Sequence, residues 1–266
     1  MRLTREELEQ VCGIAALAGQ EIMRVYSGKF TAWTKADHSP LTEADLCADS
    51  VIRKGLAQAF PGLFIWSEES SSVQAQQPAG TFFLVDPLDG TKEFLKRNGE
   101  FTVNIALIHD HIPVAGVVGV PAQGEMFFAS QGLGAWHRQA GCADTALNTA
   151  PCPDDGRALR ILGSRSHGTE QLDHWLGKLQ RPHSLVSVGS SLKFCRIAQG
   201  LADVYPRFGP TSQWDTAAAQ AVLEQAGGAV RDARGNSLRY GLQLPVLNGN
   251  FVALGDPGLS LPALPS

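Results

Sequence analysis

The segment 81–94, TFFLVDPLDGTKEF, constrains the fold more than any other stretch of the chain. Its apolar first half predicts a short buried strand, and Asp86 stands at the end of that run. We expect Pro87 to end the strand, because proline has no N–H to donate to a neighbouring strand. The Asp-Gly pair that follows predicts a turn, and the residues from Thr91 onward predict the start of a helix. The segment therefore predicts a strand-to-helix corner.

This corner also carries residues suited to chemistry. Asp86 and Asp89 lie three residues apart, and hard cations prefer carboxylate oxygens as ligands. Gly90 lets the backbone approach a ligand closely, and the free N–H groups of a helix start favour phosphate. An isolated pair of this kind most often caps a turn, so its interpretation depends on the rest of the chain.

Three further acidic motifs stand elsewhere in the sequence. Asp45 occupies the third position of a helix predicted to follow Thr42, an arrangement close to a capping box. Glu68 and Glu69 follow a short predicted strand, and in an extended chain adjacent side chains point to opposite faces, so only one would reach a shared site. Asp215 is expected to be the N-cap of an alanine-rich helix. Each motif has a structural explanation when it is taken alone.

Taken together, the motifs resemble the signature of the Mg²⁺-dependent, lithium-sensitive phosphomonoesterases of the inositol monophosphatase superfamily. That signature is an Asp, then Glu-Glu, then D-P-[IL]-D-[GS]-T, and finally W-D ahead of a helix. Its parts occur here in order, at Asp45, 68–69, 86–91 and 214–215. Longer strings resemble the bacterial CysQ type of 3'(2'),5'-bisphosphate nucleotidase within this superfamily, and they cover residues 86–108, 188–195 and 205–228.

The predicted fold class is α/β, with an α+β first half and an α/β second half. Sequential strands joined by short turns predict an antiparallel meander in the first half, and alternating strands and helices predict an α/β layer in the second. The resemblance implies a layered αβαβα sandwich of the sugar-phosphatase type. A Gly-, Ala- and Asp-rich segment at 139–156 predicts a boundary between a metal-binding domain, 1–150, and a substrate-specificity domain, 151–266.

The resemblance further implies direct hydrolysis of a phosphate monoester with two or three Mg²⁺ ions, Mn²⁺ being an alternative. Four carboxylates in one cleft repel one another, so cations or protons must compensate them, and the lack of a His or Cys motif favours oxygen-only ligation. The implied metal ligands are Glu68, Asp86, the Leu88 carbonyl, Asp89 and Asp215. The implied catalytic residues are Asp45 and Thr91, which orient the attacking water, and Glu68, beside a third ion.

Substrate contacts follow from the same resemblance and from the strand-to-helix corners of the second half, where ligands of such sheets bind. The expected substrate-binding residues are Leu88, Asp89, Gly90, Thr91, Ser190, Ser191, Lys193, Arg207 and Asp215. The expected substrate is 3'-phosphoadenosine 5'-phosphate, cleaved to AMP and phosphate in sulfur assimilation and nucleotide recycling. Three alternatives remain open: an inositol monophosphatase or related sugar-phosphate phosphatase, a haloacid-dehalogenase-type phosphatase, and a non-catalytic regulatory or RNA-associated member.

Composition limits partners and location. The 22 basic and 26 acidic residues give a net charge of −4, which argues against a nucleic-acid partner. Five scattered cysteines fit reduced thiols, and the polar N-terminus does not resemble a signal peptide. We expect a cytoplasmic monomer or homodimer without a transmembrane segment, with peripheral contact at the inner membrane left open. The resemblance places a loop at 35–37 near the site.

Overall fold

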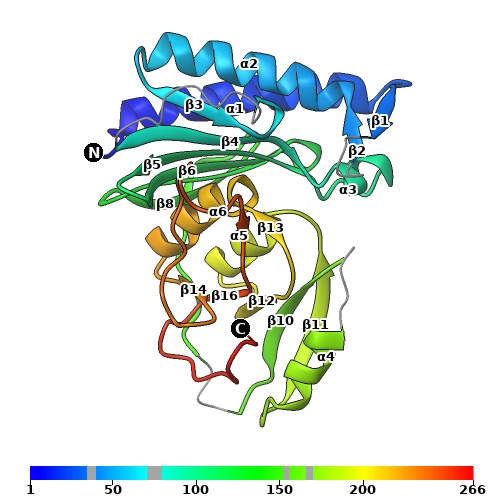
Figure 1. Ribbon diagram of the computed structural model, residues 1–266, viewed down its shortest axis with the longest axis vertical. Helices are drawn as coiled ribbons and strands as arrows, with labels where there is room; N and C mark the ends of the chain where they lie inside the picture. The colour runs from blue at the N-terminus through cyan, green and yellow to red at the C-terminus, as the bar shows by residue number, and fades with distance from the viewer. Residues whose placement is uncertain (35–39, 71–79, 153–155, 166–169, 266) are drawn as a thin grey trace.

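The computed structural model describes residues 1–34, 40–70, 80–152, 156–165 and 170–265. Its elements form five layers in the order helix, sheet, helix, sheet, helix (Figure 1). This arrangement confirms the predicted αβαβα sandwich. The loop expected at 35–37 lies outside the described residues.

Two long helices form the first layer and cover the outer face of the larger sheet (Figure 1). Helix α1 buries an apolar stripe, because side chains three and four positions apart share one helical face. Helix α2 follows Thr42, and Asp45 completes the expected capping box. The elements of this layer and the hairpin before α2 are α1 (Arg5–Tyr26), β1 (Ala32–Thr34), β2 (Pro40–Thr42) and α2 (Glu43–Ala59).

The larger sheet has seven strands in the order β3-β4-β5-β6-β7-β8-β9. Strands β3 and β4 are parallel, and every later pair is antiparallel, which confirms the predicted meander and extends it by two strands. Its elements are β3 (Phe64–Ser67), η1 (Glu68–Ser70), β4 (Thr81–Asp89), α3 (Thr91–Leu95), β5 (Thr102–His109), β6 (Ile112–Val120), η2 (Pro121–Gln123), β7 (Glu125–Ser130), β8 (Gly134–Gln139) and β9 (Thr145–Ala146).

Strand β4 does not end before Pro87, so that prediction was wrong. The strand continues to Asp89, and its register shifts between Asp86, which pairs with Asn104, and Asp89, which pairs with Thr102. Three steps along β4 therefore match two steps along β5, which is the signature of a β-bulge. A bulge tolerates Pro87 because one residue there stands outside the regular hydrogen-bond ladder.

A middle layer of helices lies between the two sheets (Figure 1) and consists of α5 (Leu192–Ala198) and α6 (Gln213–Gln225). Helix α6 packs closely on the larger sheet, and a Cβ atom at Gly116 would lie only 2.1 Å from the carbonyl oxygen of Ala218. Trp214 is buried and meets Trp66 edge to face, with 5.6 Å between the ring centroids. One apolar core therefore spans both halves, while their division into domains 1–150 and 151–266 stays a proposal.

The smaller sheet has five strands in the order β11-β10-β12-β16-β14. Strands β11, β10 and β12 are parallel, as an α/β layer requires, whereas β16 is antiparallel to both of its neighbours. Helix α4 forms the last layer (Figure 1). The elements of this sheet and layer are β10 (Leu159–Ser164), α4 (Glu170–Gly177), β11 (His183–Val188), β12 (Val204–Arg207), β14 (Ala229–Asp232) and β16 (Phe251–Leu254). A separate antiparallel pair is formed by β13 (Thr211–Ser212) and β15 (Leu247–Asn248).

Within the described residues, every helix is too short or too polar to cross a lipid bilayer.

Candidate active site

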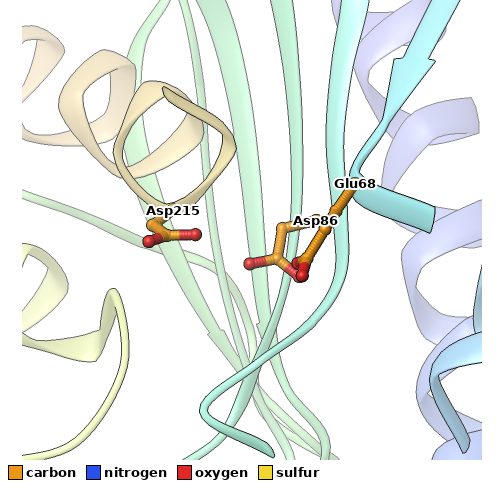
Figure 2. A group of neighbouring side chains, drawn as sticks. All are labelled: Glu68, Asp86 and Asp215. Carbon is orange, nitrogen blue, oxygen red and sulfur yellow. The ribbon is translucent and has the colours of Figure 1, made fainter. Parts of the chain in front are cut away.

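Three carboxylates from separate elements converge where the two halves meet. Glu68 opens η1, Asp86 lies near the end of β4, and Asp215 lies in the first turn of α6. Each offers one oxygen, and these oxygens all lie within 4.8 Å of one another. Figure 2 shows the three side chains turned toward a common space. We call Glu68, Asp86 and Asp215 the acidic trio.

Local structure fixes two members of the trio. The Oδ1 atom of Asp86 accepts a hydrogen bond from the Leu88 N–H at 3.0 Å, across the bulge. The sequence had suggested Asp215 as the N-cap of its helix, but the N-cap is Ser212, three residues earlier, and α6 begins at Gln213. Asp215 occupies the third helical position, and its Oδ2 atom accepts the Ser212 N–H at 3.0 Å.

The adjacent acids Glu68 and Glu69 do not continue a strand. They open the short 3-10 helix η1, so the alternation expected for an extended chain does not apply to them. Glu68 nonetheless belongs to the acidic trio and Glu69 does not. The turn of the 3-10 helix, rather than strand alternation, separates the two side chains.

Asp89 stands beside the trio rather than within it. It lines the same pocket as Glu68 and Asp215, but its Oδ2 atom accepts the Ser191 N–H at 2.6 Å. That bond ties the carboxylate to the corner between β11 and α5. The first half of the chain therefore supplies Asp89, and the second half orients it.

Burial and crowding raise the pKa of these acids. The pKa of Asp86 lies well above its ordinary value, first because the side chain is buried and then because Glu68, Asp89 and Asp215 are negative. Burial and then the charges of Asp89 and Glu68 raise the pKa of Asp215 in the same way. Burial raises the pKa of Asp89 to about 6. The site therefore binds protons or cations in the folded protein.

Asp45 and Thr91 meet at one side of this site. Asp45 is 2% exposed, and its Oδ2 atom accepts from the N–H and the hydroxyl of Thr42 at 2.7 and 2.6 Å. Its Oδ1 atom lies 3.4 Å from Thr91 Oγ1, which lies equally far from the Leu88 carbonyl. Thr91 begins α3 but does not cap it, since the N-cap is Gly90 with φ of 89°, a conformation that favours glycine.

Comparison with known proteins agrees with this geometry. The model of the family described as "Inositol monophosphatase family" matches residues 4–257. The chain belongs to the inositol monophosphatase family. This membership rules out the haloacid-dehalogenase alternative, in which Glu68 and Asp215 have no place.

Within the inositol monophosphatase family, the chain is similar to bisphosphate nucleotidases. The 3'(2'),5'-bisphosphate nucleotidases CysQ of Salmonella typhimurium and Escherichia coli K12 are 45% and 44% identical, each over 92% of this chain and 98% of the relative. A crystal structure of CysQ from Bacteroides thetaiotaomicron matches with a TM-score of 0.80 and 36% identity, over 94% of this chain and 97% of that chain. An inositol monophosphatase from Anabaena, 24% identical, shares the fold with a TM-score of 0.73 over 94% of this chain and 90% of its own.

The acidic trio fits the divalent cation on which the inositol monophosphatase family in general depends. Its donors are carboxylate oxygens, which suit Mg²⁺ and Mn²⁺ better than zinc. Because the pKa of Asp86 and of Asp215 is raised, ionising these neighbouring carboxylates together costs free energy that a bound cation would offset. The residues present thus match the charge and the chemistry of such an ion.

The pocket that Glu68, Asp89 and Asp215 line also carries two cations. Lys193 is 4% exposed and donates to the carbonyls of Ser190 at 2.6 Å and Val188 at 3.2 Å. Burial lowers its pKa to about 8. Arg207 is 9% exposed and donates to Thr211 Oγ1 at 2.7 Å. Both side chains line the pocket, as do the expected substrate contacts Gly90, Thr91, Ser190 and Ser191.

Sequence reasoning missed the polar side chains of the segment before and within β5. Glu100 accepts the Gly189 N–H at 2.7 Å and pairs with Arg165 at 2.8 Å. Thr102 and Asn104, in the first half of the chain, contact Ser191, in the second half. The available signal was the alternation of polar residues at positions 100, 102 and 104 with the apolar residues of a buried strand.

Proposed function

We propose that this protein is a Mg²⁺-dependent phosphatase that hydrolyses 3'-phosphoadenosine 5'-phosphate to AMP and phosphate. One observation carries the proposal: Glu68 and Asp215 of the acidic trio line one pocket together with the cations Lys193 and Arg207. A substrate with two phosphates fits such a pocket. The identity of 44–45% with bisphosphate nucleotidases over 92% of the chain supports the choice of a nucleotide.

On the acidic side, we propose Glu68, Asp86, the Leu88 carbonyl, Asp89 and Asp215 as the ligands of two Mg²⁺ ions, with a third ion near Glu68. When bound, such ions neutralise the phosphate charge and make water a better nucleophile. These ligands would hold the cations, and the N–H groups of Gly90 and Thr91 face the phosphate that water attacks, while the 3'-oxygen of AMP is the leaving group. The backbone at Gly90 allows this approach because no side chain intervenes.

Thr91 and Asp45 orient the attacking water. A hydroxyl has one proton and two lone pairs, and the carboxylate Oδ1 of Asp45 is the stronger of the two acceptors near Thr91 Oγ1. When Thr91 donates to Asp45, its lone pairs remain free to accept a hydrogen bond from water. Direct attack by this water on phosphorus needs no covalent intermediate.

Arg207 and Lys193, which line the same pocket, bind the phosphate that is not cleaved. Lys193 has three N–H donors and uses two of them on carbonyls. Arg207 has five and uses its Nε and Nη2 atoms for hydrogen bonds to Thr211 and Pro210. Arg207 therefore keeps more donors for an anion, and Lys193 mainly contributes charge. Ser190 is half-buried at the same corner and would bind a ribose hydroxyl or the phosphate.

Phosphate release from a panel of monoesters in Mg²⁺ tests the proposal. We expect kcat/KM for 3'-phosphoadenosine 5'-phosphate to exceed that for inositol 1-phosphate by orders of magnitude, and its 5'-phosphosulfate analogue to be cleaved as well. A preference for inositol 1-phosphate would be compatible with the proposed metal site but would refute the proposed substrate. Absence of hydrolysis across the panel would favour a non-catalytic role.

A further inference from the structure

A buried polar network joins β5 to the corner before α5. Thr102 and Asn104 are 0% and 1% exposed, and Ser191 is 2% exposed. The Oγ atom of Ser191 lies 2.9 Å from Thr102 Oγ1 and 2.8 Å from Asn104 Oδ1. Thr102 and Asn104 stand two positions apart on β5, so their side chains share one face of the sheet. The three side chains form a continuous hydrogen-bonded chain between the two halves of the protein.

This network ends on Asp89. The Ser191 N–H donates to Asp89 Oδ2 at 2.6 Å, and Thr102 Oγ1 lies 3.5 Å from the same oxygen. The bulge in β4 places Asp89 opposite Thr102. A short N–H bond to a carboxylate is stronger than one between neutral groups. The direction in which Asp89 points therefore depends on where Ser191 is held.

The protons of the network can run toward Asp89. As placed, Asn104 Nδ2 is a buried donor that lacks an acceptor among the described residues. Amide oxygen and nitrogen are assigned from the surrounding hydrogen bonds, and a turned amide lets Nδ2 donate to Ser191 Oγ. Ser191 then donates to Thr102, and Thr102 donates to Asp89 Oδ2.

This direction suits the chemistry of the groups better than the reverse one. Each hydroxyl gives one proton and accepts one, and the chain ends on a carboxylate, which accepts only. In the reverse direction, Thr102 gives its proton to Ser191, so the carboxylate of Asp89 receives none from this chain. Turning the amide exchanges an unpaired buried donor for an unpaired buried oxygen and gains a hydrogen bond to a charged group.

We propose that Asn104, acting through Ser191 and Thr102, is a positioning residue that holds the Asp89 carboxylate for the second cation. The inference rests on the proposed function, in which Asp89 is a metal ligand. It gives the Ser191 hydroxyl a structural role between Thr102 and Asn104, whereas the sequence had suggested contact with substrate. None of the three side chains needs to touch the substrate in order to act.

Direct Mn²⁺ binding, followed from the EPR signal of the free ion, tests this role without enzymatic turnover. Asn104→Leu and Ser191→Ala each interrupt the hydrogen-bonded network at one residue, and the double variant interrupts it at both. We expect each single change to weaken the affected Mn²⁺ site about tenfold, as loss of an outer hydrogen-bond partner does in other metal sites. The double variant should bind Mn²⁺ no more weakly than either single one, because one break already separates Asn104 from the hydroxyl that contacts Asp89.

Thr102 supplies a second test in case Asn104→Leu does not fold. Thr102→Val should weaken Mn²⁺ binding, and Thr102→Ser, which keeps the hydroxyl, should restore it. The matched control is Ser130→Ala in the same sheet, since Ser130 is also 0% exposed and donates to the Leu3 carbonyl at 2.8 Å. That control should lower stability and leave the Mn²⁺ affinity unchanged.

The outcomes separate this inference from the proposed function. Unchanged Mn²⁺ affinity in folded Thr102→Val, additive effects of Asn104→Leu and Ser191→Ala, or a wild-type protein that binds no Mn²⁺ would each overturn it. A wild-type protein that binds Mn²⁺ but releases no phosphate from the nucleotide would overturn the proposed function alone.

Discussion

Replacing Asp215 with Asn should stabilise the metal-free protein while it removes activity. The substitution takes one charge out of the acidic trio and leaves an amide oxygen that can still accept the Ser212 N–H. The trio oxygens lie within 4.8 Å of one another, and two unit charges at that separation repel by about 3.5 kcal/mol at an effective dielectric of about 20. Protonation relieves part of this repulsion because the pKa of Asp215 is raised.

We therefore expect the metal-free variant to gain about 1–3 kcal/mol, or roughly 2–6 °C in Tm for a chain of this size. The assay is thermal unfolding in EDTA and again in Mg²⁺, beside phosphate release. Mg²⁺ should raise the Tm of wild type more than that of Asp215→Asn. Turnover of the variant should fall by at least about a hundredfold, since a charged ligand of the cation clamp is lost.

Asp203→Asn is the matched control. Asp203 carries the same charge, but it pairs with Arg160 at 2.6 Å and Arg157 at 3.4 Å, and its side chain is 5% exposed. Its removal leaves two guanidinium groups without their acid, so Tm should fall and the Mg²⁺ response should stay. A metal-free Tm for Asp215→Asn that falls as it does for Asp203→Asn, or near-wild-type turnover in limiting Mg²⁺, would refute the reasoning.

Further predictions follow from the same site. Without metal, Tm should rise as pH is lowered from about 8 to about 5, because Asp86, Asp89 (pKa about 6) and Asp215 keep protons in the folded protein that the unfolded chain has lost. Saturating Mg²⁺ should flatten this pH profile. A Tm that rises with pH in EDTA would contradict the raised pKa values. Thr91→Ala should lower turnover by about a hundredfold or more at nearly unchanged Tm, because Thr91 orients water and does not cap α3; Thr91→Ser should retain most activity, and a variant with full turnover would remove Thr91 from the mechanism. Arg207→Ala should raise KM for the bisphosphate nucleotide more than KM for inositol 1-phosphate. Equal changes of KM for both substrates would argue against a second phosphate bound by Arg207. Li⁺ at millimolar levels should inhibit phosphate release, as the family resemblance implies, and insensitivity would count against a shared metal mechanism.

Much of this architecture is local in origin and so could be predicted from the sequence. The apolar stripe of α1 and the capping box at Asp45 depend on residues within one or two turns. Strand β4 up to Asp86 and the start of α3 at Thr91 follow from an apolar run and an Asp-Gly turn. The motifs around Asp45, Glu68, Asp86 and Asp215 indicated one acidic site because together they resemble the signature of the inositol monophosphatase superfamily.

The positions of the carboxylates required the tertiary structure. In a regular strand, side chains three residues apart point to opposite faces, so Asp86 and Asp89 would have been separated. The pairing with β5 inserts one extra residue between them and brings both onto the face that carries Asn104 and Thr102. Asp215 reaches this face because α6 packs closely over Gly116.

The role of the corner before α5 was also beyond the sequence. Ser191 was recognisable as a polar residue before a helix, but its N–H reaches a carboxylate 102 residues away. Hydrogen bonds over such separations depend on how the halves pack, which the core around Trp214 decides. Local sequence determined which residues carry oxygen ligands and caps, and long-range packing decided which oxygens face one another.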